Sequence, residues 1–495
     1  MSVDQSDITR VATADPIDDP ITTTTTEPGR NNPIDPLDRL DPIGESEEVE
    51  IDPSLLDRDA IDFGDDKPER AYDDFLLASL ADIEAWLAAE FEPAFGFPYE
   101  PLEGGVFAGY PERSSPIPGC GEPATSYDDL QLFVAFYCPL DDFIVYDDGE
   151  EGLLATLADE FGPATIGIVL AHEYGHALQE RTGALRLNIP TVTTEQQADC
   201  VAGAWAGRAA SGAAQGLPFT DDDVRAGLIS MIRVQDPVGL DPTDPGGHGS
   251  GFDRVGAFQV GFNEGLGRCA GLIDDPLPLT PLQFSTADIS TGGNARFGFG
   301  EDELFGFLVP DLNLLYDNDL QVQFPNFEPL TLEAVSSIGE IDCESPFGLF
   351  ELGVELCSAT NTAFLNEPVA EELYQIGDFA PGYLLGIIWA EHAQISNDSQ
   401  RSGEDRQLRN DCLVGAWVNT VTPDPVTGRL PEPRDAGRET SISPNDLTEA
   451  IQTAIVIGDR RSTTDILGSA FEKIDATAAG ISLAFIASTT SAPET

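Results

Sequence analysis

Apolar residues recur at helical spacing in several stretches of the 495-residue chain. The first stretch begins near residue 71 and contains Phe75, Leu76, Leu80, Ile83 and Trp86. A Gly/Pro-rich connection then leads to two short apolar runs, LQLFVAFYCP and DFIVYD, which predict strands. This mixture of helix and strand patterns indicates an α+β domain.

Two further helices are predicted after these strands. The apolar segment IGIVLAHEYGHALQ predicts a helix that stops at Gly183. A second helix opens at Thr193 or Thr194 and runs through EQQADCVAGAWAG. Gly175 on the first helix and Gly203 on the second would let the two helices approach closely.

The same order of patterns returns later in the chain. ELGVELCS, YLLGIIWAEHAQI and RNDCLVGAWV follow one another, and GSAFEKIDATAAG then echoes GSGFDRVGAFQVG without a gap. Six identical residues align in order: Cys138 with Cys357, Gly167 with Gly386, Asp199 with Asp411, Cys200 with Cys412, Gly203 with Gly415, and Trp205 with Trp417. The sequence therefore indicates an internal duplication.

The duplication and the changes in composition predict four segments. Residues 1–70 are too poor in large apolar groups to offset the entropy of ordering, which predicts a disordered acidic leader. The first copy spans 71–272, a Gly/Pro/Asp-rich linker spans 273–300, and the second copy spans 301–495.

The charge of the chain excludes two classes of partner. Acidic residues number 88 against 24 basic ones, a formal net charge of -64. Nucleic acids and anionic membrane surfaces are therefore poor partners. The acidic residues are spread along the whole length, which favours a solvated surface over calcium sites or disorder.

The cysteines and the lack of membrane signals bear on localisation. No stretch reaches the roughly 18 to 20 apolar residues that a membrane helix needs, and the start MSVDQSDITR does not resemble a signal peptide. Seven cysteines without a CxxC pair favour disulfides over a thiolate metal site. We therefore expect an extracytoplasmic or secreted protein, although no signal peptide is visible at this start.

The segment HEYGH supplies zinc-binding residue types at helical spacing. His172 and His176 are four residues apart, so on a helix both imidazoles leave the same face and can bind one ion. Glu173 is placed to take a proton from water at the open coordination position. The alternative for a bare HExxH string is a helix with two exposed histidines.

A third ligand is expected from the second helix. Glu195 lies 19 residues after His176, at the opening of that helix, and Asp199 follows it on the same face. We expect Glu195 to bind the metal and Asp199 to accept the remaining ring hydrogen of His172 or His176, which would fix the tautomer of that imidazole.

The second copy lacks the metal ligands. In its register, the positions of His172, Glu173, His176 and Glu195 hold Glu391, His392, Ile395 and Gln407. His248 aligns with Leu467 and so disappears together with the ligands, as expected of a residue that stabilises an oxyanion at the metal. The alternative is a histidine paired within a loop.

Several other residues receive no place in the predicted site. Arg254 aligns with Lys473, and this retention of a cation indicates structural pairing. Tyr174 and His392 are interpreted as packing or surface residues. The segment 142–147 is a candidate edge strand that could hold an extended peptide.

The first copy resembles the bacterial family of putative neutral zinc metallopeptidases, of the gluzincin type. The resemblance rests on FYCP at 136–139, HEYGH at 172–176, EQQADC at 195–200, HGS at 248–250 and Arg254, and is densest from 131 to 272. It implies peptide-bond hydrolysis with zinc held by His172, His176 and Glu195. It does not name a substrate.

The alignment of the two copies also predicts how the cysteines pair. Local pairs join Cys120 with Cys138 and Cys343 with Cys357, while Cys200 would reach Cys269. Cys269 aligns with Ser488, which leaves Cys412 without a partner. The sequence alone does not establish this connectivity.

We therefore expect an α+β, zincin-like metallopeptidase domain followed by a degenerate, noncatalytic copy of the same domain. One Zn²⁺ per chain would activate water with Glu173 as general base, and the partner would be a peptide or protein substrate. One alternative is a cell-envelope binding or scaffold protein with a structural zinc site, although such sites normally have four protein ligands and three are found here. Another is a hydrolase acting on a non-peptide amide. The cleavage specificity and the oligomeric state stay open.

Overall fold

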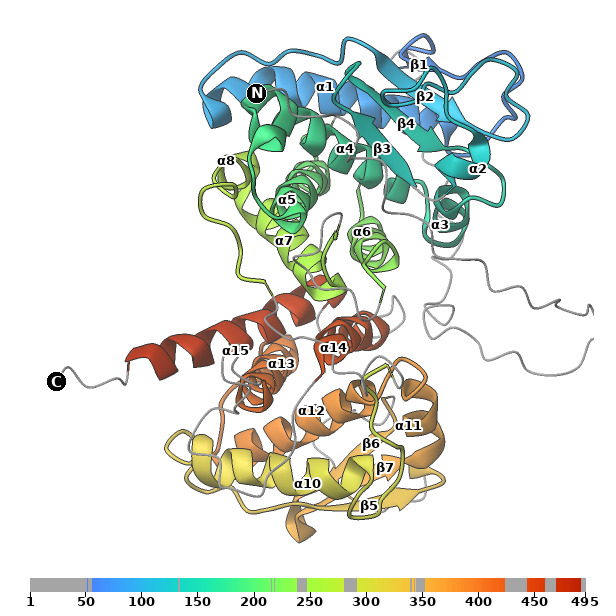
Figure 1. Cartoon of the computed structure of the whole chain (residues 1–495). Helices are drawn as coiled ribbons and strands as arrows, with labels where there is room; N and C mark the ends of the chain where they lie inside the picture. The colour runs from blue at the N-terminus through green and yellow to red at the C-terminus, as the bar shows by residue number, and fades with distance from the viewer. Residues whose placement is uncertain are drawn as a thin grey trace, which may run out of the picture. The chain divides into compact units, whose positions relative to one another are not determined.

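The structure is a computed structural model of the 495-residue chain. It describes residues 51, 56–131, 134–214, 216–217, 219–237, 247–279, 292–338, 341, 343, 352–422, 443–458 and 469–490, with the backbone alone at 444 and 482–490. Within these residues helices predominate and the strands form two small sheets, so the fold mixes α and β structure (Figure 1).

Four strands of the first half form a sheet in the order β1-β2-β4-β3. Their bounds are Ile61–Asp62 for β1, Gly105–Gly109 for β2, Ala135–Cys138 for β3 and Phe143–Asp147 for β4. β2 runs parallel to β1 and β4, whereas β3 is antiparallel to β4. The two predicted strands therefore form, but the expectation of an edge strand at 142–147 is wrong, because β2 pairs with the other side of β4. β3 lies at the end of the sheet.

The fold includes residues that precede the expected boundary at 71. Ile61 is buried in β1, which extends the sheet beyond β2. Lys67 Nζ lies 2.8 Å from Asp73 Oδ1, and Arg70 Nη2 donates to the Asp148 carbonyl at 2.8 Å. Residues 56–70 thus belong to the first half, while 1–50 and 52–55 of the expected leader lie outside the described residues.

The first half also contains helices, of which α4 (Ala164–Thr182) contacts the sheet through β3. They are α1 (Asp73–Phe95), α2 (Tyr127–Leu130), α3 (Leu153–Phe161), α4 (Ala164–Thr182), α5 (Thr191–Ala210), α6 (Asp221–Arg233), α7 (Gly251–Glu264) and α8 (Leu266–Ala270), with a 3₁₀ turn at Ala184–Arg186. The apolar residues predicted for α1 are buried. α4 contacts β3 and α5, and α5 also packs along α7 (Figure 1).

The ends and contacts of α4 and α5 largely match the sequence pattern. α4 ends at Gly183, whose φ of 80° is the left-handed conformation that suits glycine. α5 begins at Thr191, slightly before the expected opening. A Cβ on Gly175 would lie 2.6 Å from Ala198 Cα, so this glycine does admit α5. Gly203 instead faces α7, where a Cβ would overlap the Phe258 carbonyl oxygen.

The second half contains a three-stranded sheet in the order β5-β7-β6. β5 (Thr331–Val335) is parallel to β7 (Thr362–Asn366), and β6 (Val354–Cys357) is antiparallel to β7. Its helices are α10 (Leu304–Leu314), α11 (Glu367–Leu373), α12 (Phe379–Ser396), α13 (Gly403–Val421), α14 (Pro444–Ile457) and α15 (Ala470–Thr490), with a π turn at Leu315–Asp319 and a 3₁₀ turn at Ser358–Thr360. β5, β7 and β6 thus pair in the same manner as β2, β4 and β3.

A matching side-chain contact occurs in each half. Trp205 Nε1 on α5 donates to Asp82 Oδ2 at 3.1 Å, and Trp417 Nε1 on α13 donates to Asp311 Oδ2 at 2.7 Å. Both indoles are buried, and buried indole N–H groups need such an acceptor. The aligned tryptophans therefore anchor corresponding helices in the same way.

The cysteines pair as the repeat proposed. Cys412 forms no disulfide, and the three disulfides are Cys120–Cys138, Cys200–Cys269 and Cys343–Cys357. The Cys200–Cys269 bond joins α5 to α8, whereas the other two are local.

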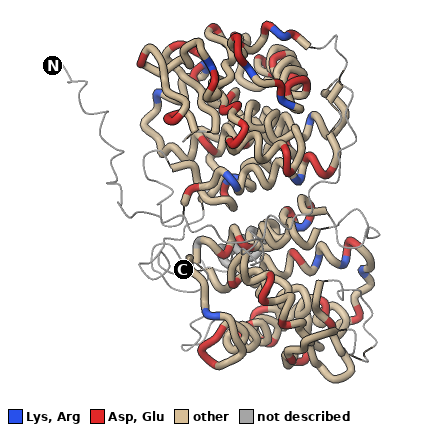
Figure 2. Tube along the Cα trace, turned by 90° about the vertical axis from the view of Figure 1, so that its right-hand side faces the viewer, with Lys and Arg blue, Asp and Glu red and all other residues tan. Residues whose placement is uncertain are grey.

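Three further features concern the chain as a whole: its division into compact units, its helix lengths and its distribution of charge. The described residues of both halves belong to one compact unit, and the linker expected at 273–300 stays a prediction. Residues 280–291 of that linker lie outside the described residues. None of the described helices combines the length and apolar character that crossing a bilayer requires. Acidic residues are spread over both halves (Figure 2).

Candidate metal centre

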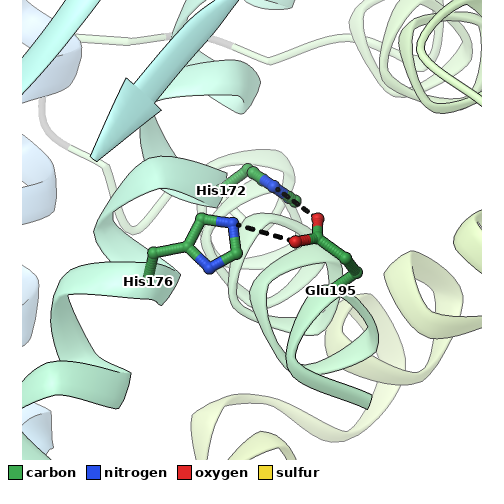
Figure 3. A group of neighbouring side chains, drawn as sticks. All are labelled: His172, His176 and Glu195. Atoms are coloured by element: carbon green, nitrogen blue, oxygen red, sulfur yellow. Dashed lines mark ion pairs between the residues drawn. The ribbon is translucent and has the colours of Figure 1, made fainter. Parts of the chain in front are cut away.

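Side chains from α4 and α5 converge in the first half. His172 and His176 lie one turn apart on α4, and Glu195 lies near the beginning of α5. His172 Nε2 is 3.3 Å from Glu195 Oε2, and His176 Nε2 is 3.5 Å from Glu195 Oε1. Figure 3 shows both imidazoles turned toward the carboxylate. One nitrogen or oxygen from each residue lies within 4.8 Å of the others, so the structure brings the three predicted ligands together.

Glu173 is buried directly beside these ligands. Burial raises the pKa of its carboxyl, and although the charges of His176 and His172 and a hydrogen bond with the Tyr137 backbone lower that pKa, it stays above its ordinary value. Tyr137 lies on β3, so Glu173 is next to the strand that ends the sheet. Glu173 Oε2 forms no hydrogen bond within the described residues. Such a carboxyl can accept a proton from a nearby water.

The two imidazoles and the carboxylate shift one another's pKa values. Burial lowers the pKa of His172, but Asp199 and Glu195 outweigh it and raise that pKa to about 10. Burial raises the pKa of Glu195, but the charges of His176 and His172 bring it well below its usual range. Protons and metal ions compete for the same ring nitrogens, so metal binding here is favoured by rising pH.

Asp199 and Arg254 fix the orientation of the first histidine. Asp199 Oδ1 lies 2.7 Å from His172 Nδ1. Arg254 on α7 donates from Nη2 to Asp199 Oδ1 at 2.7 Å and from Nε to Oδ2 at 3.0 Å. Burial raises the pKa of Asp199, but Arg254 and His172 bring it below its ordinary value. An ionised Asp199 accepts a hydrogen bond from Nδ1–H, which leaves His172 Nε2 able to bind a metal.

Gln179 makes the corresponding contact with the second histidine. His176 Nδ1 lies 3.0 Å from Gln179 Oε1, and Gln179 Nε2 donates to the Thr194 carbonyl at 2.6 Å. Gln179 is fully buried. Gln179 was not predicted from the sequence, although its position three residues after His176 places the two side chains on one face of the helix.

His248 lies outside the group of three ligands. Its Nδ1 is 3.3 Å from Asp236 Oδ1, and Asp236 Oδ2 accepts the backbone N–H groups of His248 at 2.8 Å and Gly249 at 2.7 Å. The hydrogen bond with Asp236 raises the pKa of His248, burial lowers it and the charge of Glu195 raises it, with a net increase. Half of the His248 side chain is exposed. Asp236 is a second residue that sequence analysis missed.

Part of the chain that contains this site matches a known protein family. Residues 119–270 match the family described as putative neutral zinc metallopeptidase. The family predicted from the sequence is thus confirmed for this segment. This segment contains the three candidate ligands and also Glu173, Asp199, Gln179 and His248. The family implies zinc and a peptide substrate.

Similar proteins occur in two mycobacterial species, and their descriptions add no activity. Uncharacterized proteins of Mycobacterium bovis and Mycobacterium tuberculosis are 32% identical over 168 residues, which covers 30% of this chain. The match spans 55% of the length of each relative. No solved structure matches the chain.

The residues of the family segment fit a zinc ion. Two imidazole nitrogens and one carboxylate oxygen are the ligand types of catalytic zinc sites, and a three-residue set leaves one position for water or substrate. Glu195 Oε2 is buried and has no hydrogen-bond donor within the described residues, which a metal would satisfy. Tyr174 takes no part, since its hydroxyl donates to Glu84 Oε1 at 2.7 Å.

The positions aligned with the ligands in the second half form a different buried network. Arg406 Nε donates to both oxygens of Glu391 at 2.9 Å. Asn410 Nδ2 donates to Glu391 Oε2 at 3.0 Å and to Gln407 Oε1 at 3.1 Å. His392 is buried and its Nε2 lies 3.0 Å from the Glu328 carbonyl, so it is a packing residue. A guanidinium therefore neutralises the carboxylate in this half.

One other group of potential ligands occurs among the described residues. Asp378, Asp446 and Glu449 are buried and place carboxylate oxygens within 4.8 Å of one another. The amides of Ala295 and Phe379 donate to Asp378 at 2.6 Å and to Glu449 at 3.0 Å, respectively. Burial raises the pKa of Asp378 to about 6, so these carboxyls can share protons.

Proposed function

We propose that the first half is a zinc metalloendopeptidase that holds one Zn²⁺ through His172, His176 and Glu195. The convergence of these side chains from two helices is the single observation that carries the proposal. The family match over 119–270 supports it, because hydrolysis of peptides by zinc is the activity that the family description implies.

Zinc bound at this site would acidify water and polarise the scissile carbonyl. Glu173 then takes the proton of the attacking water, because its carboxyl is buried beside the ligands and has a raised pKa. The same carboxyl returns the proton to the leaving amine. Asp199 and its partner Arg254 hold His172 in the tautomer that presents Nε2.

His248 serves in this proposal as a donor to the oxyanion that forms on the substrate carbonyl. Its raised pKa extends the pH range over which the imidazole is protonated, and Asp236 holds the ring. β3 supplies the binding edge for an extended peptide, since it ends the sheet and its Tyr137 backbone contacts Glu173.

We further propose that the second half is a degenerate, noncatalytic copy of the first. The matching pairings of β2-β4-β3 and β5-β7-β6 support a common origin. The Asp199–Arg254 ion pair also has a counterpart in Asp411–Lys473, where Lys473 Nζ lies 2.8 Å from Asp411 Oδ2. The three disulfides are compatible with an extracytoplasmic location, which we include in the proposal.

Zinc content and peptide cleavage of the wild type and of Glu173→Gln test the enzymatic function. We expect Glu173→Gln to keep zinc and to lose about 10²- to 10⁴-fold in kcat/KM, the usual loss when a general base is removed. Internally quenched peptides with blocked ends are the substrates, since only an endopeptidase cleaves them. Glu180→Gln, the same change on the same helix, is the control and should cleave like the wild type.

Two outcomes would overturn the proposal. Cleavage by Glu173→Gln at the wild-type rate would show that another group activates the water. Stoichiometric zinc without cleavage of any member of a broad peptide library would favour the alternative, a binding or scaffold protein with a structural zinc site.

A further inference from the structure

The two histidines of the proposed site are held by chemically different partners. His172 Nδ1 faces an ionised carboxylate, Asp199, which Arg254 neutralises. His176 Nδ1 faces the neutral amide of Gln179 at 3.0 Å. Asp199 lies on α5, whereas Gln179 lies on α4 with its own histidine. The second partner is therefore local to the HEYGH helix and carries no charge.

The contact of Gln179 with Thr194 settles which end of the amide faces the imidazole. The Thr194 carbonyl can only accept, so the 2.6 Å contact requires the Nε2 end of Gln179 there. Oε1 is then directed to His176 Nδ1, and an amide oxygen can only accept. His176 must therefore carry a proton on Nδ1, so that Nε2, 3.5 Å from the Glu195 carboxylate, is the nitrogen left to bind a metal.

Gln179 also ties the second ligand to the third through the chain. Thr194 directly precedes Glu195, so one side chain bonds the ring of His176 and the backbone next to the Glu195 ligand. Burial protects both bonds from competition by water, because Gln179 is fully buried. Displacement of Gln179 would release the imidazole and loosen α5 against α4 together.

We propose that Gln179 is a positioning residue that selects the metal-binding tautomer of His176 and sets the distance between His176 and Glu195. This inference rests on the proposed zinc site and adds to it a residue that binds neither metal nor substrate. A neutral amide suits the position, because a second ionised carboxylate there would be buried without an Arg254-like counter-ion.

In the second half a glutamine at another position of the corresponding helix bonds the next helix. Gln394 Nε2 on α12 donates to the Arg406 carbonyl at 3.1 Å, and Arg406 directly precedes Gln407 as Thr194 precedes Glu195. The Gln394 amide oxygen accepts from Ser399 Oγ at 3.1 Å. Gln394 aligns with Gly175 rather than with Gln179, and Ile395 stands where His176 is, so a bond between the two helices forms there without an imidazole. The hydrogen bond with His176 is therefore what Gln179 adds in the first half.

Zinc affinity, measured by competition with chelators of graded strength, tests this role without reference to activity. Gln179→Met removes both bonds, and we expect its zinc affinity to fall about 10- to 100-fold, the usual effect of losing a partner of a metal-bound histidine. Gln179→Glu should retain most of the affinity, since a neutral carboxyl can donate to Thr194 and accept from His176. If Gln179→Met does not fold, Gln179→Ala, which also removes both bonds, is measured in its place.

Gln197→Met is the matched control. Gln197 is also a buried glutamine that donates to a backbone carbonyl, that of Cys269 at 2.9 Å, but it does not contact an imidazole. Its zinc affinity should equal that of the wild type. Wild-type affinity in Gln179→Met, or an equal loss in Gln197→Met, would overturn the inference. Tight zinc binding that depends on Gln179 without any peptide cleavage would instead overturn only the proposed function.

Discussion

At the scale of single residues, His248 depends on a partner that its neighbours in the sequence do not reveal. Asp236 precedes His248 by 12 residues, yet its carboxylate bonds the imidazole and two backbone N–H groups around it. Burial raises the pKa of Asp236, but the hydrogen bonds with His248 and with the backbone bring it below its ordinary value. The pair can therefore present a charged imidazole to a substrate.

Asp236→Asn should narrow the pH range of activity on its alkaline side. The raised pKa of His248 keeps the imidazolium populated to higher pH, so the loss of the Asp236 charge lowers that pKa and the alkaline limb of kcat/KM moves to lower pH. The pH profile of kcat/KM measures this shift. Asp57→Asn changes an exposed aspartate that also accepts a backbone N–H, that of Asp59, and should leave the profile unchanged. An unchanged profile in Asp236→Asn would exclude His248 as the group that titrates.

The proposed ligands and Asp199 were predictable because their spacing is local, whereas the contacts that Arg254 and Asp236 make were found only in the fold. His172, Glu173 and His176 occupy one helical turn, and Glu195 opens the next long helix. Arg254 and Asp236 reach the site from α7 and from the chain after α6, and no periodic pattern links them to it. Gln179 was not predicted, although it shares a helix face with His176 and its position could have revealed it.

At the scale of elements, helices were easier to predict than the order of strands. Apolar spacing and Gly183 marked α4 within a single segment of sequence. The position of β4 inside the sheet depends on β2, a partner distant in sequence, so the pattern of residues 142–147 could not show it. β1 contains two residues and lies in a stretch of acidic composition, which hid it from any periodicity.

Gly203 controls how closely α5 and α7 pack, and Gly203→Ala should destabilise the protein. The added Cβ would overlap the Phe258 carbonyl, which is backbone and cannot rotate away, so we expect a loss of at least about 1–3 kcal/mol in the free energy of unfolding. Gly256→Ala on α7 is the control, because its Cβ would meet no atom within 4 Å and should add about 0.5–1 kcal/mol of stability. Urea unfolding compares the two. Equal stability of both variants would disprove this close packing.

At the scale of the whole chain, the two halves hold charge in their interiors by different means. In the first half, two imidazoles and one carboxylate converge. In the second half, Arg406 and Asn410 occupy the surroundings of Glu391, and Gln407 stands where the third ligand would be. The guanidinium supplies the positive charge that a metal supplies in the proposed site. The second half should therefore be stable without a metal.

Arg406→Met tests this substitution of a side chain for a metal. The variant leaves Glu391 buried without its cation, so we expect a loss of about 3–5 kcal/mol in the free energy of unfolding. The double variant Glu391→Met/Arg406→Met should recover most of that loss, because paired apolar residues of similar size replace a buried ion pair at little cost. Urea unfolding gives the stabilities and elemental analysis the zinc content, which should stay at one ion per chain in both variants. Zinc content is measured under conditions in which the variant is folded. A fall in zinc content with Arg406→Met would mean that the second half contributes to metal binding, and that its buried network does more than stabilise the fold.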